Sequence, residues 1–242
     1  MRIFLLPPII GMLLLNNVYC QDQFFSEALV PSPNISVELQ VVALPRAAAL
    51  PLMRELLDPT KTEQAYEKIQ GMLVAGTARL VGWPTLVTRP GQRTVAEGVT
   101  EFRYPTEFSS GGVGIYLTAD GKDFLKQDAK ISGVPLDAVP TSFETRNLGV
   151  TLELDPMLAS DDQMIDVNVR AQNTWLKEMR SVKIERDVNE KITVEQPVIG
   201  ANNVTTFLSL KSGQRVLLGS FTNSEAPDHM ELFLFKVEVR KP

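Results

Sequence analysis

Residues that could carry out catalysis or bind a metal are few and scattered in this chain. His229 is the only histidine, and it follows Asp228 in a short polar loop. One histidine and one aspartate do not complete a transition-metal site without distant carboxylates. A serine nucleophile would need His229 as its base, and no Gly-x-Ser-x-Gly turn presents a serine to it. The sequence therefore predicts no catalytic residue and indicates a protein that is not an enzyme.

Oxygen ligands suited to calcium are more plentiful. Asp155, Asp161, Asp162 and Asp166 gather around one predicted turn, but they lack the glycine-punctuated spacing of a calcium loop. We interpret them as a polar turn beside one solvated strand face. The glycine-rich run at residues 109–114 is not followed by the Gly-Lys-Ser/Thr of a phosphate-binding loop. No cofactor and no metal ligand set is predicted.

The composition is that of an ordinary globular protein. The chain has 242 residues, of which 44% are hydrophobic and 22% charged. This length allows one large domain or two small ones with a sizeable core. The formal net charge of −5 at pH 7 includes no basic excess. Nucleic acid and anionic membrane surfaces are therefore not expected as partners.

The N-terminus has the layout of a secretory signal peptide at residues 1–20. Arg2 supplies one positive charge, and residues 3–15 form an apolar run that prolines interrupt. The run is too short for a transmembrane helix of about 20 residues, and cleavage is predicted between Cys20 and Gln21. An uncleaved anchor and a lipid-modified Cys20 are the alternatives. Because Cys20 is the only cysteine, cleavage leaves a mature chain without disulfides or thiolate ligands.

A polar tether at residues 21–34 leads into the folded part. Residues 35–44 alternate apolar and polar side chains, which predicts a strand. A short helix is predicted at residues 47–57. Pro51 is expected to mark its start, because proline lacks the backbone N–H that the interior of a helix requires.

The strongest helix signal is at residues 61–75, where apolar side chains recur at the 3.6-residue period. Thr62 is expected to cap its start, and Gly76 stands where a glycine follows a helix end. Strands are then predicted at residues 78–88 and 94–102, joined by a turn that contains proline and glycine.

A loop-like stretch follows at residues 104–140, with one short strand at residues 113–118. Beyond it, residues 149–154 and 164–169 alternate at a period of two and predict a half-buried hairpin. Asp155-Pro156 is expected to open the turn of this hairpin, because proline fixes φ and aspartate bonds its own backbone.

A second hairpin is predicted near the C-terminus. Residues 204–210 and 215–221 flank Gly213, which supplies the glycine that a tight turn needs. Residues 231–240 form the last strand, and a bulge near Lys236 would keep its two faces in register.

Together these signals predict an α+β, β-rich fold. An N-terminal strand and helical segment precedes an extensive, mostly antiparallel sheet, to which weaker strand signals at residues 175–196 also belong.

The order of these pieces resembles the secretin family, the ring-forming outer-membrane gates of bacterial type II and type III secretion and of type IV pili. Three stretches carry the resemblance: GTARLVGWPTLVTRPGQRTVAEGVTEFRYPTEF, TRNLGVTLELDP followed by IDVNV, and FLSLKSGQRVLLGSF followed by ELFLFKVEV. The residues that match the family's structural motifs are Pro84, Thr88, Gly149, Val150, Leu152, Pro156, Gly213 and Gly219.

The resemblance implies how the mature chain is divided. A strand-helix-strand part of a secretin-like core is expected at residues 35–108, a loop-rich insert at 109–140, and the β-hairpin region of the core at 141–242. The family's upstream ring-building domains have no counterpart in this sequence, so we expect a short, stand-alone form.

The resemblance also implies a function. We expect an exported, non-enzymatic protein of the periplasm or outer membrane that pairs through its β-edges with copies of itself or with other secretion or pilus subunits. A soluble periplasmic binding or adaptor module is the alternative. Membrane association is expected only through a complex, because residues 180–186 carry Lys183, Glu185 and Arg186. A charged Arg or Lys on a lipid-facing strand costs about 2–4 kcal/mol at the bilayer midplane.

Overall fold

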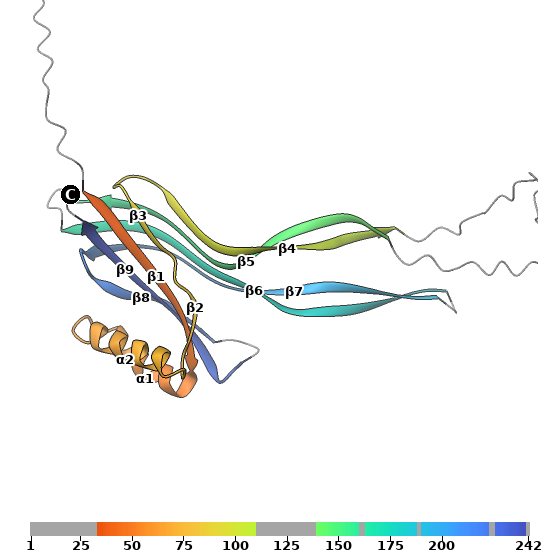
Figure 1. The fold of residues 1–242 in the computed structure, drawn as a ribbon, viewed down its shortest axis with the longest axis horizontal. Coiled ribbons are helices and arrows are strands. Elements are labelled where there is room, and N and C mark those ends of the chain that lie inside the picture. The colour runs from red at the N-terminus through yellow and green to blue at the C-terminus, as the bar shows by residue number, and fades with distance from the viewer. Residues whose placement is uncertain (1–32, 110–138, 160–162, 188–189, 223–225, 241–242) are drawn as a thin grey trace, which may run out of the picture. The chain divides into compact units, whose positions relative to one another are not determined.

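The computed structural model describes residues 33–109, 139–159, 163–187, 190–222 and 226–240. They form two antiparallel sheets and two helices (Figure 1). In chain order the elements are β1 (Asn34–Pro45), α1 (Arg46–Leu56), α2 (Thr62–Val74), β2 (Arg79–Gly82), β3 (Thr85–Thr88), β4 (Thr94–Ser109), β5 (Val139–Leu158), β6 (Met164–Asp187), β7 (Glu190–Lys211), β8 (Arg215–Thr222) and β9 (His229–Arg240). The β-rich α+β class predicted from the sequence is confirmed.

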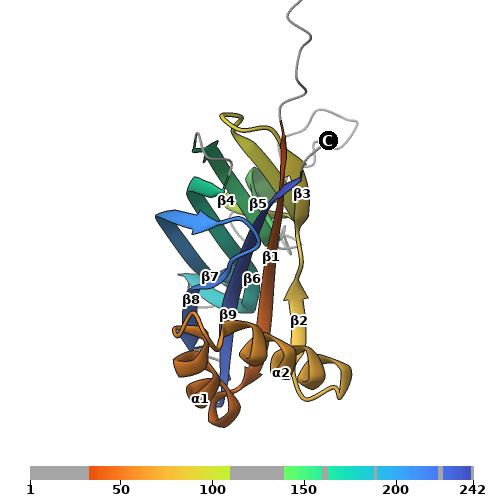
Figure 2. The same ribbon diagram turned by 90° about the vertical axis from the view of Figure 1, so that its left-hand side faces the viewer.

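The first sheet has five strands in the order β2-β1-β9-β8, and β3 also pairs with β1. Its centre is the pair β1–β9, whose register runs unbroken from Asn34 opposite Arg240 to Pro45 opposite His229. Helices α1 and α2 cover one face of this sheet (Figure 2). The other face packs on the second sheet.

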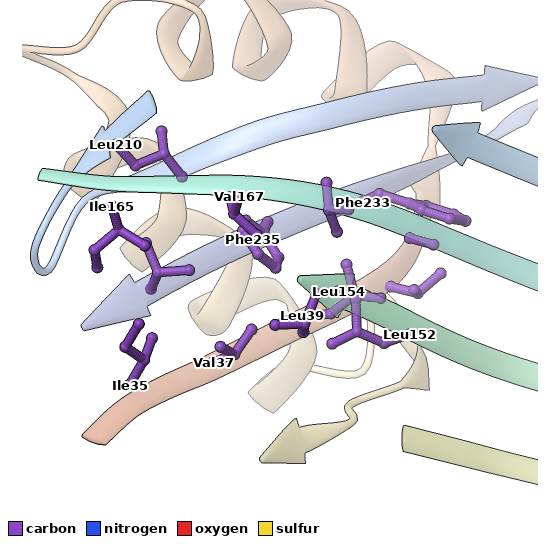
Figure 3. Packing of buried hydrophobic residues seen from close by; sticks show 14 of the residues in the cluster. Ile35, Val37, Leu39, Leu152, Leu154, Ile165, Val167, Leu210, Phe233 and Phe235 are labelled. Atoms are coloured by element: carbon purple, nitrogen blue, oxygen red, sulfur yellow. The ribbon is translucent and has the colours of Figure 1, made fainter. Parts of the chain in front are cut away.

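One hydrophobic core lies between the two sheets, and Figure 3 shows part of its packing. From the first sheet, Leu39, Phe233 and Phe235 are fully buried. The second sheet contributes every other side chain along its strands, namely Val150, Leu152, Leu154, Ile165, Val167, Val169, Ala171 and Leu210. Burying a leucine or phenylalanine stabilises a fold by about 1.5–3 kcal/mol, so this layer holds the sheets together.

A second core lies beneath the helices. Leu44 of β1 and Leu232 and Leu234 of β9 meet Leu52 of α1 and Ile69 of α2. Strands β1 and β9 therefore bury both of their faces. This double burial explains why β9 is apolar on both sides rather than alternating with polar residues.

The second sheet has four strands in the order β4-β5-β6-β7. Pairing between β5 and β6 extends only from Leu158 opposite Ile165 to Gly149 opposite Thr174. Beyond this point, which we call the fork, the strands continue as two separate hairpins (Figure 1). The β4–β5 arm comprises residues 100–109 and 139–148, and the β6–β7 arm comprises residues 175–187 and 190–200.

The helices differ from the sequence expectation in detail. Helix α1 begins at Arg46, so Pro51 lies inside it and does not mark its start. Thr62 is the first residue of α2, and its hydroxyl donates to the carbonyls of Leu56 and Asp58 instead of capping the helix. The prediction for Gly76 is confirmed, because it follows the C-cap of α2 with a φ of +71°.

The predicted hairpin around Gly213 is wrong. Its two flanking strands, β7 and β8, belong to different sheets: β7 pairs with β6 and β8 pairs with β9. The turn itself exists, and Gly213 has a φ of +84°. The backbone of this turn, however, forms hydrogen bonds with other parts of the chain. Ser212 N–H donates to Gln163 O, and Gly213 N–H donates to Val237 O. The turn is therefore a crossover between sheets.

Three further strand predictions are corrected. Asp155-Pro156 lies inside β5 rather than in a turn, since Pro156 pairs with Val167. Residues 104–109 belong to strand β4 and not to a loop. No register shift occurs near Lys236; the shift in this region is on β8, between Leu217 and Gly219.

Residues 78–88 form two short strands instead of one, because Trp83 and Pro84 interrupt the strand between β2 and β3. The weak signals at residues 175–196 are confirmed as the arm portions of β6 and β7. The signal peptide, most of the tether, the strand predicted at 113–118 and the Asp161-Asp162 pair lie outside the described residues.

Candidate interaction edges and the fork of the four-stranded sheet

The four-stranded sheet has two open edges within the described residues. Strand β4 pairs only with β5, and β7 only with β6. Along the outer side of each strand, backbone N–H and C=O groups have no partner from the sheet. Such an edge is a template for pairing with another strand. The chemistry that these edges offer is backbone hydrogen bonding.

The two open edges are complementary in direction. All three pairings in the sheet are antiparallel, so β4 and β7 run in opposite directions. If β4 of one copy lies beside β7 of the next, the new pair is antiparallel as well. The sheet then continues with the same face toward the same side. A contact of this kind is head-to-tail and can repeat from copy to copy.

Proline limits the length of each edge that can pair. Pro105 lies in β4 and Pro197 in β7, and proline within a sheet is tolerated on edge strands because it has no N–H to donate. Both prolines lie in the arms. The proline-free parts of the edges, residues 94–104 of β4 and 198–211 of β7, include the region below the fork.

The face of this sheet that points away from the core is polar. Arg93 forms an ion pair with Glu153 of β5, and Ser209 of β7 donates to Asp166 of β6 at 2.5 Å. These groups are solvated, so the sheet has one buried and one wet face.

Exposed apolar side chains interrupt this polar face at both edges. Val95 of β4 is 49% exposed, and Phe207 of β7 is 65% exposed. Both share the face of Glu153, because Val95 pairs with Glu153 and Phe207 pairs with Asn168. A single exposed apolar residue is ordinary, but here one stands on each of the two open edges.

Two of the family-motif residues shape the entry into this sheet. The carbonyl of Pro84 accepts the Leu39 N–H at 3.0 Å and so ties the break between β2 and β3 to β1. The hydroxyls of Thr88 and Thr94 are 2.7 Å apart, and Thr88 is only 5% exposed. These contacts fix the turn from the first sheet into the second.

Four motif residues lie in β5. Gly149 is at the fork with a φ of +134°, and a Cβ there would overlap the carbonyl oxygen of Gly98 on β4. Val150 and Leu152 are buried between the sheets. Pro156 lies beyond the last β4 partner of β5, and its carbonyl accepts the Gly91 N–H at 2.6 Å. Because β4 does not pair with β5 at Pro156, this part of a central strand accommodates proline.

The last two motif residues lie at the crossover and in β8. Gly213 has the positive φ expected from the sequence. Gly219 stands at the register shift between β8 and β9, where a Cβ would lie 2.8 Å from Cγ2 of Val204. The residues predicted at the signal cleavage site, Cys20 and Gln21, lie outside the described part of the chain.

A buried carboxylate at the fork was not predicted from the sequence. Glu231 of β9 is 6% exposed, and it accepts hydrogen bonds from Asn173 of β6 and Asn202 of β7. Burial raises the pKa of the Glu231 carboxyl, while the two amides and the charge of Arg79 oppose part of this rise. The signal available was one acidic residue in an apolar strand.

A second polar group beneath the helices was also missed. Arg215 of β8 is 6% exposed, and its Nη1 is 3.3 Å from Glu38 Oε1 of β1. Its guanidinium centre lies 3.5 Å from the centre of the Tyr66 ring of α2. Burial raises the pKa of the Tyr66 hydroxyl, and the positive charge of Arg215 opposes this. Arg215 thus attaches α2 to the sheet.

The structure also bears on metals and membranes. In the part of the chain that the structure describes, no group of three or more His, Cys, Asp or Glu side chains is placed to hold a metal ion. Neither of the two described helices is long and apolar enough to cross a membrane.

No family model matches the chain, and no curated protein matches it. Solved structures to which this chain is partly similar include the Salmonella SPI-1 type III secretion injectisome secretin InvG (TM-score 0.42, 9% identity) and Aeromonas hydrophila ExeD (TM-score 0.44, 9% identity). The V. cholerae type IV competence pilus secretin PilQ is a third (0.43, 11%). The matches extend over 86%, 87% and 88% of this chain, but over only 64%, 49% and 62% of those chains.

Proposed function

We propose that this chain is an exported, non-enzymatic, secretin-like assembly component of a bacterial envelope system of the type II or III secretion or type IV pilus kind. Its copies join through β4 and β7. The observation that carries this proposal is the pair of open edges, which run in opposite directions at the two ends of one sheet. The sequence resemblance to secretins at Gly149, Val150 and Leu152 supports it.

When β4 of one copy pairs with β7 of the next, both open edges of each inner copy are paired. A β4–β4 contact would close into a dimer and leave both β7 edges open. In a head-to-tail contact, each copy donates one β4 and one β7, so only the two ends of the assembly keep an open edge. Since an open edge invites further pairing, the head-to-tail contact leaves the fewest unpaired backbone groups.

The proposed localisation is the bacterial envelope, outside the cytoplasm. It rests on the charged, apolar and cleavage-site order of residues 1–20. Intact-mass measurement of the protein recovered from the envelope fraction tests it. We expect a mature chain that begins at Gln21. A mass that retains residues 1–20, or that includes a lipid on Cys20, contradicts this part of the proposal.

Proline substitutions test the edge pairing directly. Pro105 and Pro197 show that proline fits these two strands. Residues an even number of positions apart direct their N–H groups to the same side of a strand, so Glu97→Pro and Thr205→Pro should remove outward donors and spare the pairs with β5 and β6. We expect the mature protein to sediment as oligomers and each proline variant as monomers.

Matched controls separate loss of pairing from loss of folding. Glu97→Val and Thr205→Val place a strand-forming residue at the same positions and should associate as the unmodified protein does. Circular dichroism should give proline variants the same strand signal as the unmodified protein. Proline variants that fold and still associate to the same extent would show that β4 and β7 are not the contacts.

A further inference from the structure

The contact made by Glu231 joins the two sheets through charge and not through apolar packing. Oε1 of Glu231 accepts from Asn173 Nδ2 at 2.7 Å, and Oε2 accepts from Asn202 Nδ2 at 2.9 Å. Asn173 and Asn202 are directly opposite each other on β6 and β7. All three side chains are at least nine-tenths buried, with 6%, 6% and 9% of their surface exposed. One carboxylate of the first sheet thus binds two strands of the second.

This contact lies at the fork. Asn173 pairs with Val150, and the next pair, Thr174 with Gly149, is the last between β5 and β6. Beyond it, the β6–β7 arm has no strand partner in the described part of the sheet. Glu231 therefore holds the root of this arm to the five-stranded sheet at the position where support from β5 ends.

The carboxylate has little compensation for its charge. In the described part of the chain no Lys, Arg or His nitrogen forms an ion pair with Glu231 within 4.0 Å. Its strand partners on β1 and β8, Ala43 and Phe221, are uncharged. Arg79 of β2 and His229 of β9 line the same cavity of about 340 Å³ as Glu231, and Arg79 acts on it only as a charge at a distance.

We propose that Glu231, Asn173 and Asn202 form a proton-controlled joint, in which the β6–β7 arm is held to the five-stranded sheet more firmly when Glu231 is neutral than when it is charged. A buried anion without a counter-ion favours any opening that lets water reach it. A neutral carboxylic acid removes that drive. It keeps both contacts, because one amide can turn and present its oxygen to the new O–H donor.

The direction of the effect follows from linkage. Burial raises the pKa of Glu231 in the closed joint, so the closed state holds the proton more tightly than the opened one. Between the ordinary pKa of a glutamate and the raised one, closure therefore weakens as pH rises. One proton is involved, which limits the change in the opening constant to about tenfold per pH unit. Outside that pH window the opening constant does not depend on pH.

Hydrogen exchange of the backbone amides tests the joint. Protection of residues 172–176 and 199–203, corrected for the intrinsic exchange rate, is measured from about pH 4 to pH 8. We expect protection to fall with rising pH in the unmodified protein. In Glu231→Gln, which retains Arg79 and His229, protection should be independent of pH and higher near neutrality.

Two controls make the outcome specific. The root of the β4–β5 arm, residues 100–104 and 144–148, has no buried carboxylate and should not share the pH dependence. Glu144→Gln, on that arm, should leave the β6–β7 arm unchanged. The joint is refuted if protection at the β6–β7 root does not vary with pH, or varies equally in Glu231→Gln.

A direct titration covers the case in which Glu231→Gln does not fold. The carboxyl carbon of Glu231 is followed by NMR in the unmodified protein. A pKa at or below that of an exposed glutamate would overturn the proposal. The titration and the protection of residues 172–176 do not depend on association between copies, because β6 is not an edge strand. The joint and the edge pairing therefore succeed or fail separately.

Discussion

The two sheets of this protein share one core but are built under opposite constraints. In the five-stranded sheet, β1 and β9 are covered on both faces, by the helices on one side and by the second sheet on the other. The four-stranded sheet is covered on one face only, and its two edge strands are open. Substitutions at nearly every central position of the first sheet are therefore expected to destabilise the fold. The second has surface left over for contacts with other chains.

The difference is visible in where charge occurs. Beneath the helices, Arg215 is buried against Glu38 and Tyr66. On the outer face of the second sheet, Arg93 and Glu153 form their ion pair in solvent. A buried charge that loses its partner is costly, whereas an exposed ion pair contributes at most about 1 kcal/mol. The same pair of residue types thus has a different effect in each sheet.

The largest expected effect contrasts two phenylalanines. Phe233→Ala, in the doubly covered β9, should lower the free energy of unfolding by about 3–5 kcal/mol, because it leaves a cavity between the sheets. Phe207→Ala, on the outer face of β7, should change it by no more than about 0.5 kcal/mol. Denaturant midpoints of the two variants give the comparison. Similar losses would mean that the outer face is buried in the isolated protein.

The second prediction concerns glycine at the fork. Gly149→Val should lower the stability by more than about 3 kcal/mol, since it combines a φ of +134° with an overlap at Gly98 O. Gly213→Val has the unfavourable φ of +84° but open space around the new side chain, and should lower it by about 1–3 kcal/mol. Equal denaturant midpoints for the two variants would show that β4 and β5 separate easily at the fork.

A third comparison uses the two arginines. Arg215→Ala should lower the stability by about 2 kcal/mol, through loss of the contacts with Glu38 and Tyr66. Arg93→Ala should lower it by less than about 1 kcal/mol. Raising the salt concentration should diminish the Arg93 effect and leave most of the Arg215 effect. An Arg215→Ala variant as stable as Arg93→Ala would show that α2 does not depend on this contact.

The smallest predicted effect is a gain. Gly71 lies inside α2, and a Cβ there meets nothing within 4 Å. Gly71→Ala should raise the stability by up to about 1 kcal/mol, because alanine loses less backbone entropy in a helix than glycine. Thermal unfolding should show a small increase in the midpoint. A decrease would mean that this face of α2 contacts another part of the chain.

Elements with a strong period could be predicted from the sequence, and their partners could not. The period of 3.6 residues located α2, and alternation located β1 and the lower part of the β5–β6 hairpin. Alternation is the same in a central strand and in an edge strand, so it did not show that β4 and β7 are edges. Nor did the turn at Gly213 reveal that the strands on either side of it join different sheets.

The roles of the residues at the candidate edges and at the fork could not be predicted from the sequence either. Pro105 and Pro197 were readable signs of edge strands, but only the strand order gives them that meaning. Glu231 was one acid among 29 acidic residues. Its importance depends on Asn173 and Asn202, which lie 58 and 29 residues away along the chain. Contacts of that sequence separation are set by the packing of the sheets and leave no local pattern.

Mixing two blocked variants tests the central claim, that β4 of one copy pairs with β7 of the next. Glu97→Pro leaves β7 intact and Thr205→Pro leaves β4 intact, so each should be a monomer alone. In equal mixture they should form a one-to-one heterodimer and nothing larger, because the only intact edges are then in contact. Analytical ultracentrifugation distinguishes the outcomes. A mixture that stays monomeric, or a variant that dimerises alone, would contradict the head-to-tail contact.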